Sequence, residues 1–255
     1  MPTKFRLPKR KIYFGKFREI TSIFFFFPSS RWTPFSENIS YFLRAHLKKD
    51  RMRGIKRIHW DVTANCQMQC LYCSKRFIRE TLFGTSEAIG PLLPLDRIKI
   101  ILEEAHLLGV EYLDLTGGEP FLHPHFREII ATLEKYNLKY YPVTKYIFNL
   151  SEVKEYRALG LKEIMISLDT LNPLVADLLY NDKRFIPKMC KSISFLVNAG
   201  VHVSVSSIVG NFNITELYDF INTMMSLGVE VIRLQDFANL IFTFRGEYNK
   251  FRKIL

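Results

Sequence analysis

Strand-like and helix-like segments alternate without interruption from residue 57 to residue 234 of this 255-residue chain. Six short apolar segments predict strands, and five segments with apolar residues at helical spacing predict helices between them. Gly109, Gly160, Gly200 and Gly228 each directly follow a predicted helix, where glycine is the preferred ending residue. The predicted strands are 57–63, 112–116, 139–144, 163–168, 202–208 and 231–234, and the predicted helices are 95–108, 126–135, 150–159, 187–199 and 215–227.

This alternation predicts the fold class α/β, with parallel strands joined by right-handed crossovers. Six strand–helix units are fewer than the eight that close a barrel, so the sequence predicts a partial (βα)6 barrel of parallel strands. Functional residues of such folds gather at the carboxyl ends of the strands. The residues that follow each predicted strand are therefore the candidates for a functional site.

The predicted barrel covers residues 57–240, with a basic, aromatic-rich extension over residues 1–56 and a short tail over residues 241–255. Residues 1–57 hold 15 of the 36 Lys and Arg residues but only three of the 25 Asp and Glu residues, a formal charge of +12. Such a segment can contact nucleic acid, an acidic membrane surface or an acidic peptide, and it can equally be a solvated appendage. Within it, residues 36–49 are compatible with a helix.

Apolar runs and cysteine usage indicate the compartment. The apolar run over residues 23–27 ends at Pro28, far short of the roughly 20 residues of a spanning helix, and it does not resemble a signal peptide. Three of the four cysteines lie within eight residues, which is unlike a secreted disulfide framework and indicates a metal site in a reducing compartment. We therefore expect a cytoplasmic protein without a transmembrane segment.

The three clustered cysteines, Cys66, Cys70 and Cys73, directly follow the first predicted strand with the spacing C-x3-C-x2-C. Three thiolates on one short loop suit an iron–sulfur cubane that keeps one iron open. Zinc usually takes four ligands, so a zinc loop with a distant fourth ligand is the alternative. Cys190 lies more than a hundred residues further on, in a predicted helix, and is expected to pack as a small buried hydrophobe.

A glycine pair ends the second predicted strand, in the run Gly117-Gly118-Glu119-Pro120. Glycines allow positive φ and close approach of the backbone to a ligand. The Glu119 carboxylate could accept a hydrogen bond from an ammonium group. Alone such a run is usually a tight turn, but here it follows the cysteine loop by one β–α unit.

The cysteine spacing, the aromatic Tyr72 before the last cysteine and the Gly-Gly-Glu-Pro run together resemble the radical S-adenosylmethionine superfamily over about residues 57–240. The resemblance implies an enzyme in which a reduced [4Fe–4S] cluster cleaves S-adenosylmethionine to a 5′-deoxyadenosyl radical that abstracts hydrogen from a substrate. It implies that the cluster is held by Cys66, Cys70 and Cys73. It also implies that the cofactor is bound by Tyr72, Gly117, Gly118 and Glu119.

Further cofactor contacts are expected at the later strand ends. Ser167 and Asp169 are placed to hydrogen-bond the ribose or the carboxylate of S-adenosylmethionine, and Ile208 and Gln235 to contact its adenine. Thr144 and Lys145 could touch cofactor or substrate. All of these residue types are also common at strand ends as turn residues. The neighbouring His123 and His125 are expected to begin the next helix rather than to bind metal.

The chain resembles the branch of the family that matures peptides and cofactors, but no cysteine follows Cys190, whereas many relatives carry a cysteine-rich C-terminal domain. We expect a peptide or small-molecule substrate and an electron donor such as flavodoxin or ferredoxin. Two alternatives stay open. One is a radical enzyme that modifies RNA, since residues 1–56 interleave basic and aromatic side chains. The other is a truncated or degenerate protein that binds a cluster without catalysis.

Overall fold

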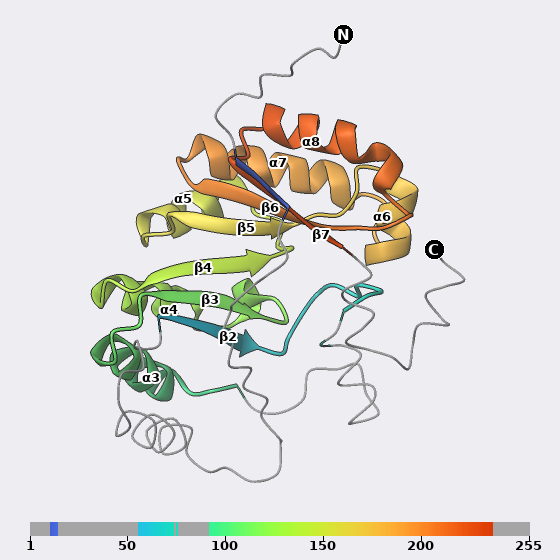
Figure 1. Cartoon of the computed structure of the whole chain (residues 1–255). Helices are drawn as coiled ribbons and strands as arrows, with labels where there is room; N and C mark the ends of the chain where they lie inside the picture. Colours follow the sequence, from blue (N-terminus) through green and yellow to red (C-terminus); the bar gives the residue numbers. More distant parts are fainter. Residues whose placement is uncertain (1–10, 15–55, 74, 76–91, 237–255) are drawn as a thin grey trace, which may run out of the picture.

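The computed structural model describes residues 11–14, 56–73, 75 and 92–236, and its described strands form one parallel sheet in the order β1-β7-β6-β5-β4-β3-β2 (Figure 1). The six predicted core strands are all present, and the α/β fold with an open parallel sheet is confirmed. The strands are β1 (Lys11–Phe14), β2 (Arg57–Thr63), β3 (Tyr112–Gly117), β4 (Lys139–Thr144), β5 (Glu163–Ser167), β6 (His202–Val209) and β7 (Val231–Asp236).

Helices connect these strands, and each predicted helix is present with ends that shift by a few residues. None of the described helices is long and apolar enough to cross a membrane. The α-helices are α3 (Leu95–Leu107), α4 (Phe126–Lys135), α5 (Leu150–Ala158), α6 (Pro173–Tyr180), α7 (Phe185–Asn198) and α8 (Leu217–Ser226), and the 3-10 helices are η1 (Pro120–Leu122) and η2 (Ile214–Glu216).

One α-helix and one strand were not predicted. The short helix α6 begins after Asn172, whose side chain accepts a hydrogen bond from the backbone N–H of Leu174 (2.9 Å). Strand β1 belongs to the N-terminal extension and pairs in parallel with β7, from Lys11 opposite Val231 to Phe14 opposite Leu234. The extension therefore contributes a strand to the sheet. The predicted helix over residues 36–49 and the tail lie outside the described residues.

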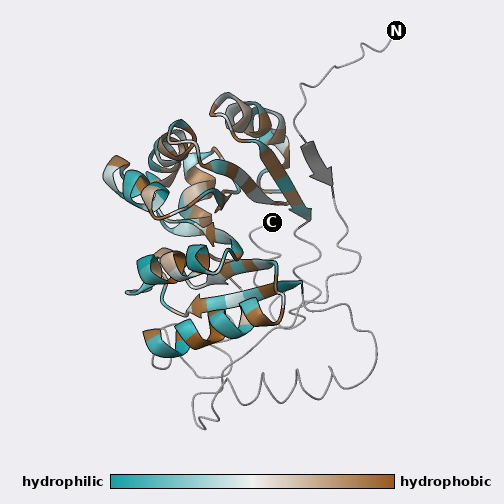
Figure 2. Cartoon of the chain, turned by 90° about the vertical axis from the view of Figure 1, so that its left-hand side faces the viewer, coloured by the Kyte–Doolittle hydropathy of each residue, from teal (hydrophilic) through white to brown (hydrophobic). Residues whose placement is uncertain are grey.

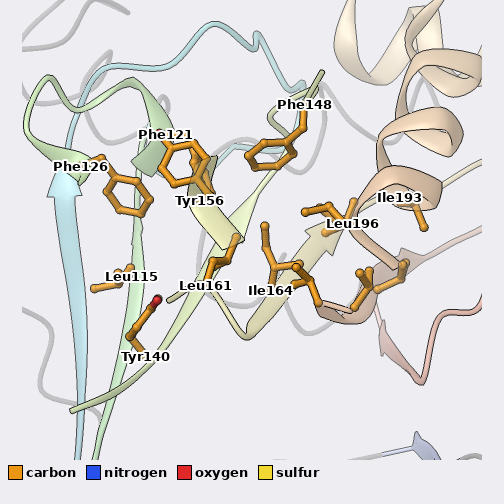
Figure 3. Close-up of a cluster of buried hydrophobic side chains, with 14 of the residues drawn as sticks. Leu115, Phe121, Phe126, Tyr140, Phe148, Tyr156, Leu161, Ile164, Ile193 and Leu196 are labelled. Atoms are coloured by element: carbon orange, nitrogen blue, oxygen red, sulfur yellow. The ribbon is translucent and has the colours of Figure 1, made fainter. Parts of the chain in front are cut away.

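The hydrophobic core lies between the sheet and the helices, which gather on one side of it (Figure 2). An aromatic group within this core centres on Phe121, whose ring centroid lies 4.6 Å from that of Phe126, 4.7 Å from that of Phe148 and 5.0 Å from that of Tyr156 (Figure 3). Phe121 follows directly after the Gly-Gly-Glu-Pro run. Core packing therefore fixes the position of this turn.

The opposite face of the sheet, here called the inner face, carries polar side chains. Arg233 of β7 reaches across two intervening strands to Tyr141 of β4, with its guanidinium 5.1 Å from the ring centroid. The Tyr141 hydroxyl is hydrogen-bonded to Ser204 of β6. Contacts between strands that are not neighbours require a strongly curled sheet. The inner face is therefore the concave interior of a partial barrel.

Candidate functional site

The cysteine loop, residues 64–73, follows the carboxyl end of β2 and lies beside α6 (Figure 1). The backbone N–H of Leu71 donates to the carbonyl of Leu179 in α6 (3.0 Å), and the N–H of Cys73 donates to the carbonyl of Cys70 (3.1 Å). Another backbone N–H, that of Met68, donates to the sulfur of Cys66 (3.4 Å). All three cysteines of the loop are half-buried. Backbone contacts thus hold the loop in place, with its three thiols partly exposed.

The thiols lie close enough to influence one another electrostatically. Burial raises the pKa of Cys66, and burial raises the pKa of Cys70 to about 12. The Cys73 thiol adds to both increases, while the Lys145 ammonium opposes them. A thiol in this environment stays protonated at neutral pH until a metal centre displaces the proton, so binding at this loop is coupled to proton release.

The loop suits a cluster better than a single ion. Within the described part of the chain, no three His, Cys, Asp or Glu side chains converge on one point as the ligands of a single metal ion would. A cubane bonds each thiolate to a different iron, so its three ligands need no common point. Cys190, the remaining cysteine, lies in α7 and packs against the hydrophobic core, as expected. The donor set therefore fits an iron–sulfur cluster with one iron left open.

The glycine pair lies directly against the segment that leads into the cysteine loop. The N–H of Gly118 donates to the carbonyl of Thr63, and the N–H of Glu119 donates to that of Asn65, both at 2.6 Å. A Cβ at Gly117 would lie 2.3 Å from the Thr63 oxygen, and one at Gly118 would lie 2.0 Å from the Asn65 oxygen. These positions require glycine because backbone meets backbone there. The two sequence motifs are thus one structural unit.

The Glu119 carboxylate is buried at 2% exposure and joins the ends of β3 and β4. It accepts hydrogen bonds from the Thr144 hydroxyl (2.5 Å), the Lys145 N–H (3.0 Å) and the Phe121 N–H (3.3 Å). Burial raises the pKa of Glu119 to about 7, although these hydrogen bonds act in the opposite direction. Both carboxylate oxygens therefore have protein donors, and a contact with an ammonium group stays a prediction.

Asp169 gathers several predicted site residues around one buried carboxylate. Its Oδ1 accepts from the N–H of Ile208 (2.7 Å), and its Oδ2 accepts from the hydroxyls of Tyr72 and Tyr180. The ammonium of Lys145 lies 3.8 Å from Oδ2. Through these contacts Asp169 links the cysteine loop to β6, to α6 and to the segment after β4.

Lys145 is a cation inside this site, with 12% of its side chain exposed. Its ammonium lies 5.2 Å from the ring centroid of Tyr180 and 5.6 Å from that of Tyr72. Burial lowers the pKa of Lys145, but the Asp169 carboxylate and the loop thiols outweigh that effect and raise it. The structure therefore places a positive charge beside the cysteine loop. Sequence reasoning missed Tyr180 because its helix was not predicted.

The other predicted cofactor contacts lie at the carboxyl edge of the sheet. Ser167 is half-buried and pairs in register with Ser206, while Gln235 is exposed and pairs with Ile208. The Nδ1 atom of His123 accepts from the His125 N–H (3.1 Å) as the chain turns into α4, which matches the expected role at the start of that helix. Cofactor contacts of these strand-end residues stay predictions.

Known proteins share both the sequence pattern and the fold. A family model described as "Radical SAM superfamily" matches residues 60–224. GTP 3′,8-cyclase of Aquifex aeolicus is 28% identical over 180 residues, which are 69% of this chain and 55% of that protein. The "antilisterial bacteriocin subtilosin biosynthesis protein AlbA" of Bacillus subtilis is 27% identical over 173 residues, which are 67% of this chain and 37% of that protein.

Solved structures agree at the level of fold. SuiB of Streptococcus suis, in a structure bound to S-adenosylmethionine, matches with a TM-score of 0.64 at 13% identity, over 79% of this chain and 45% of that chain. The chain thus spans about half the length, or less, of the known proteins that it matches here.

Proposed function

Because the chain belongs to the radical SAM superfamily, a superfamily of enzymes, we propose that it binds a [4Fe–4S] cluster and S-adenosylmethionine and modifies a peptide or small-molecule substrate by radical chemistry. The observation that carries this proposal is the half-buried loop of Cys66, Cys70 and Cys73 packed against the Gly117–Gly118 turn. Three thiolates on one short loop suit a cluster with one open iron.

When bound, the cluster and S-adenosylmethionine supply a 5′-deoxyadenosyl radical after one-electron reduction. The protein's own contribution is to position and shield. Cys66, Cys70 and Cys73 bind the cluster, and Asp169 holds their loop in place through Tyr72. Lys145 offsets negative charge that the thiolates bring into a buried site. The proposed contacts to S-adenosylmethionine come from Tyr72, Gly117, Gly118, Glu119, Ser167, Asp169, Ile208 and Gln235.

The relatives support two substrate classes. One is named for its action on GTP, and SuiB has been solved with a precursor peptide, so small molecules and peptides both occur among similar proteins. The alternative of an RNA substrate depends on residues 1–56, of which the structure describes 11–14 and 56. Salt-dependent RNA binding that disappears when residues 1–56 are removed would favour that alternative.

The proposal is tested by anaerobic reconstitution with iron and sulfide, followed by reduction in the presence of S-adenosylmethionine. We expect 5′-deoxyadenosine to form with the wild-type chain and to be lost in Cys66→Ala, Cys70→Ala and Cys73→Ala. Cys190→Ala is the matched control and should retain both cluster and product, because Cys190 belongs to helix α7 and not to the loop.

Other outcomes separate the alternatives. A bound cluster that gives no 5′-deoxyadenosine with S-adenosylmethionine would favour the non-catalytic cluster-binding protein. Zinc bound by the loop cysteines in place of iron would overturn the proposal.

A further inference from the structure

Arg233 differs from two cations of the inner face that form ion pairs. Arg57 makes a two-pronged ion pair with Asp114, at 2.7 Å from Nε and 2.5 Å from Nη2, and Lys75 pairs with Asp61. Arg233, in the described part of the chain, has no carboxylate within ion-pair distance. Two carboxylates that act electrostatically on the neighbouring Tyr141 are already engaged, Asp114 by Arg57 and Glu163 by the hydroxyl of Tyr112 (2.7 Å).

The described residues use little of the hydrogen-bonding capacity of Arg233. A guanidinium has five N–H donors, and the acceptor that the described residues offer it is the Met165 sulfur, a weak one, 3.3 Å from Nη1. Its Nε and Nη2 have no acceptor among these residues, and the Arg233 side chain as a whole is half-buried. A half-buried cation with donors left over is suited to an anionic group that the described residues do not supply.

The surroundings orient this cation. The guanidinium lies over the Tyr141 ring, and Tyr141 is itself held by its hydrogen bond to Ser204. In register, Ser206 lies beside Arg233 on the neighbouring strand and adds a hydroxyl. A guanidinium stacked on an aromatic ring presents its planar edge, which matches the two oxygens of a carboxylate or phosphate.

We propose that Arg233 forms an anion-binding subsite on the inner face, for a carboxylate or phosphate group of the substrate. This inference deepens the proposed function and rests on it for the identity of the ligand as substrate. Gln235, two residues further along β7, lies about 7 Å closer to the sheet edge that carries the cysteine loop. A substrate held by its anionic group at Arg233 would extend from the barrel interior towards that edge.

The test measures binding of two probes, pyrophosphate and glutarate, to the full-length chain without cluster by titration calorimetry. We expect at least one probe to bind the wild type and to bind Arg233→Gln about tenfold or more weakly, since a charge-assisted two-pronged contact is lost. Arg127→Gln is the control for net charge, because Arg127 pairs with Glu155 on the helical surface, and it should bind like the wild type. Arg233→Lys keeps the positive charge but cannot form the two-pronged contact of a guanidinium, and it should bind with intermediate affinity.

The outcomes are distinct. Binding that Arg233→Gln weakens supports the subsite; if only pyrophosphate binds in this way the substrate bears a phosphate, and if only glutarate does it bears a carboxylate. Equal affinity in Arg233→Gln and wild type, or no binding of either probe, overturns it. If Arg233→Gln does not fold, an affinity of Arg233→Lys equal to that of the wild type overturns the subsite instead. The 5′-deoxyadenosine assay of the wild type judges the proposed function separately, because the probe measurement needs neither cluster nor S-adenosylmethionine.

Discussion

Glu119 is a carboxylic acid in an almost fully buried position, and its burial makes the stability of the folded state depend on pH. Its pKa of about 7 in the folded chain lies above the 4.5 of an ordinary glutamate, because burial disfavours the charged form. The folded state therefore binds more protons than the unfolded state between these two values. The stability that the protonated group contributes is complete below about pH 4.5 and is lost as pH rises through about 7.

We predict that this loss is absent in Glu119→Gln, which cannot ionise. The difference in the free energy of unfolding between wild type and variant should change by about 3 kcal/mol at most between pH 4.5 and pH 8. Urea unfolding at several pH values measures it. Thr144→Val removes one hydrogen-bond donor of Glu119 and should leave a pH dependence of the same sign. A difference between wild type and Glu119→Gln that is constant with pH would contradict the prediction.

At the same scale, the structure gives the predicted glycine pair a contact that the sequence did not indicate. Glycine at positions 117 and 118 was expected to let the backbone approach a ligand. The contacts observed are with Thr63 and Asn65, which precede the cysteines by a few residues. A close approach can be inferred from glycine in the sequence, but the partner of that approach depends on tertiary packing. The same holds for Asp169, whose carboxylate was expected to face the cofactor and is occupied by protein donors.

At the scale of elements, the connection from β5 to α6 holds the cysteine loop. Asp169 follows β5, Tyr180 ends α6, and Tyr72 belongs to the loop, so one carboxylate joins three segments. A hydrogen bond to a charged group contributes about 1.5–3 kcal/mol. The contact between Tyr72 and Asp169 should therefore restrain the loop even without a bound cluster.

We predict that Tyr72→Phe lowers the free energy of unfolding by about 1.5–3 kcal/mol and speeds amide hydrogen exchange over residues 66–73, because the loop loses its hydroxyl contact with Asp169. Urea unfolding and hydrogen-exchange mass spectrometry measure the two effects. Tyr218→Phe is the matched control, since that ring is 68% exposed, and it should change stability by less than about 0.5 kcal/mol. Unchanged exchange in the loop of Tyr72→Phe would show that the contact does not restrain it.

The elements themselves were predictable where local signals were strong. Glycines at the helix ends and apolar periodicity located five helices and six strands. The start of α7 was expected at Pro187, and the helix begins two residues earlier, at Phe185. Helix α6 is only eight residues long, too short for periodicity to stand out. Its contact with the cysteine loop is a tertiary contact, which local sequence patterns do not indicate.

At the scale of the whole molecule, the parallel order of the sheet follows from the alternation of elements, but its curvature does not. Curvature is seen in the contact of Arg233 with Tyr141, which are separated by two strands of the sheet. Likewise, the pairing of β1 with β7 joins positions more than 200 residues apart, and no local pattern encodes such a partner. Both features depend on long-range packing.

The cluster site and the hydrophobic core are largely separate parts of this molecule. The core consists of residues from the sheet and its helices, and the cysteine loop adds Met68, Cys70 and Tyr72 as partly buried neighbours. Small zinc domains unfold without metal because the metal replaces a core, whereas this chain has one of its own. The fold should therefore outlast the loss of the cluster.

We predict that a variant with Cys66, Cys70 and Cys73 all replaced by alanine keeps the far-UV circular dichroism of the wild type and unfolds cooperatively, because the apolar contacts that drive folding lie outside the loop. Its melting temperature should fall below that of the cluster-loaded wild type by several degrees, since each kcal/mol of binding energy is worth about 2–4 °C at this size. Calorimetry of both proteins, with Cys190→Ala as control, makes the comparison. A triple variant without a cooperative unfolding transition would show that the barrel needs the cluster in order to fold.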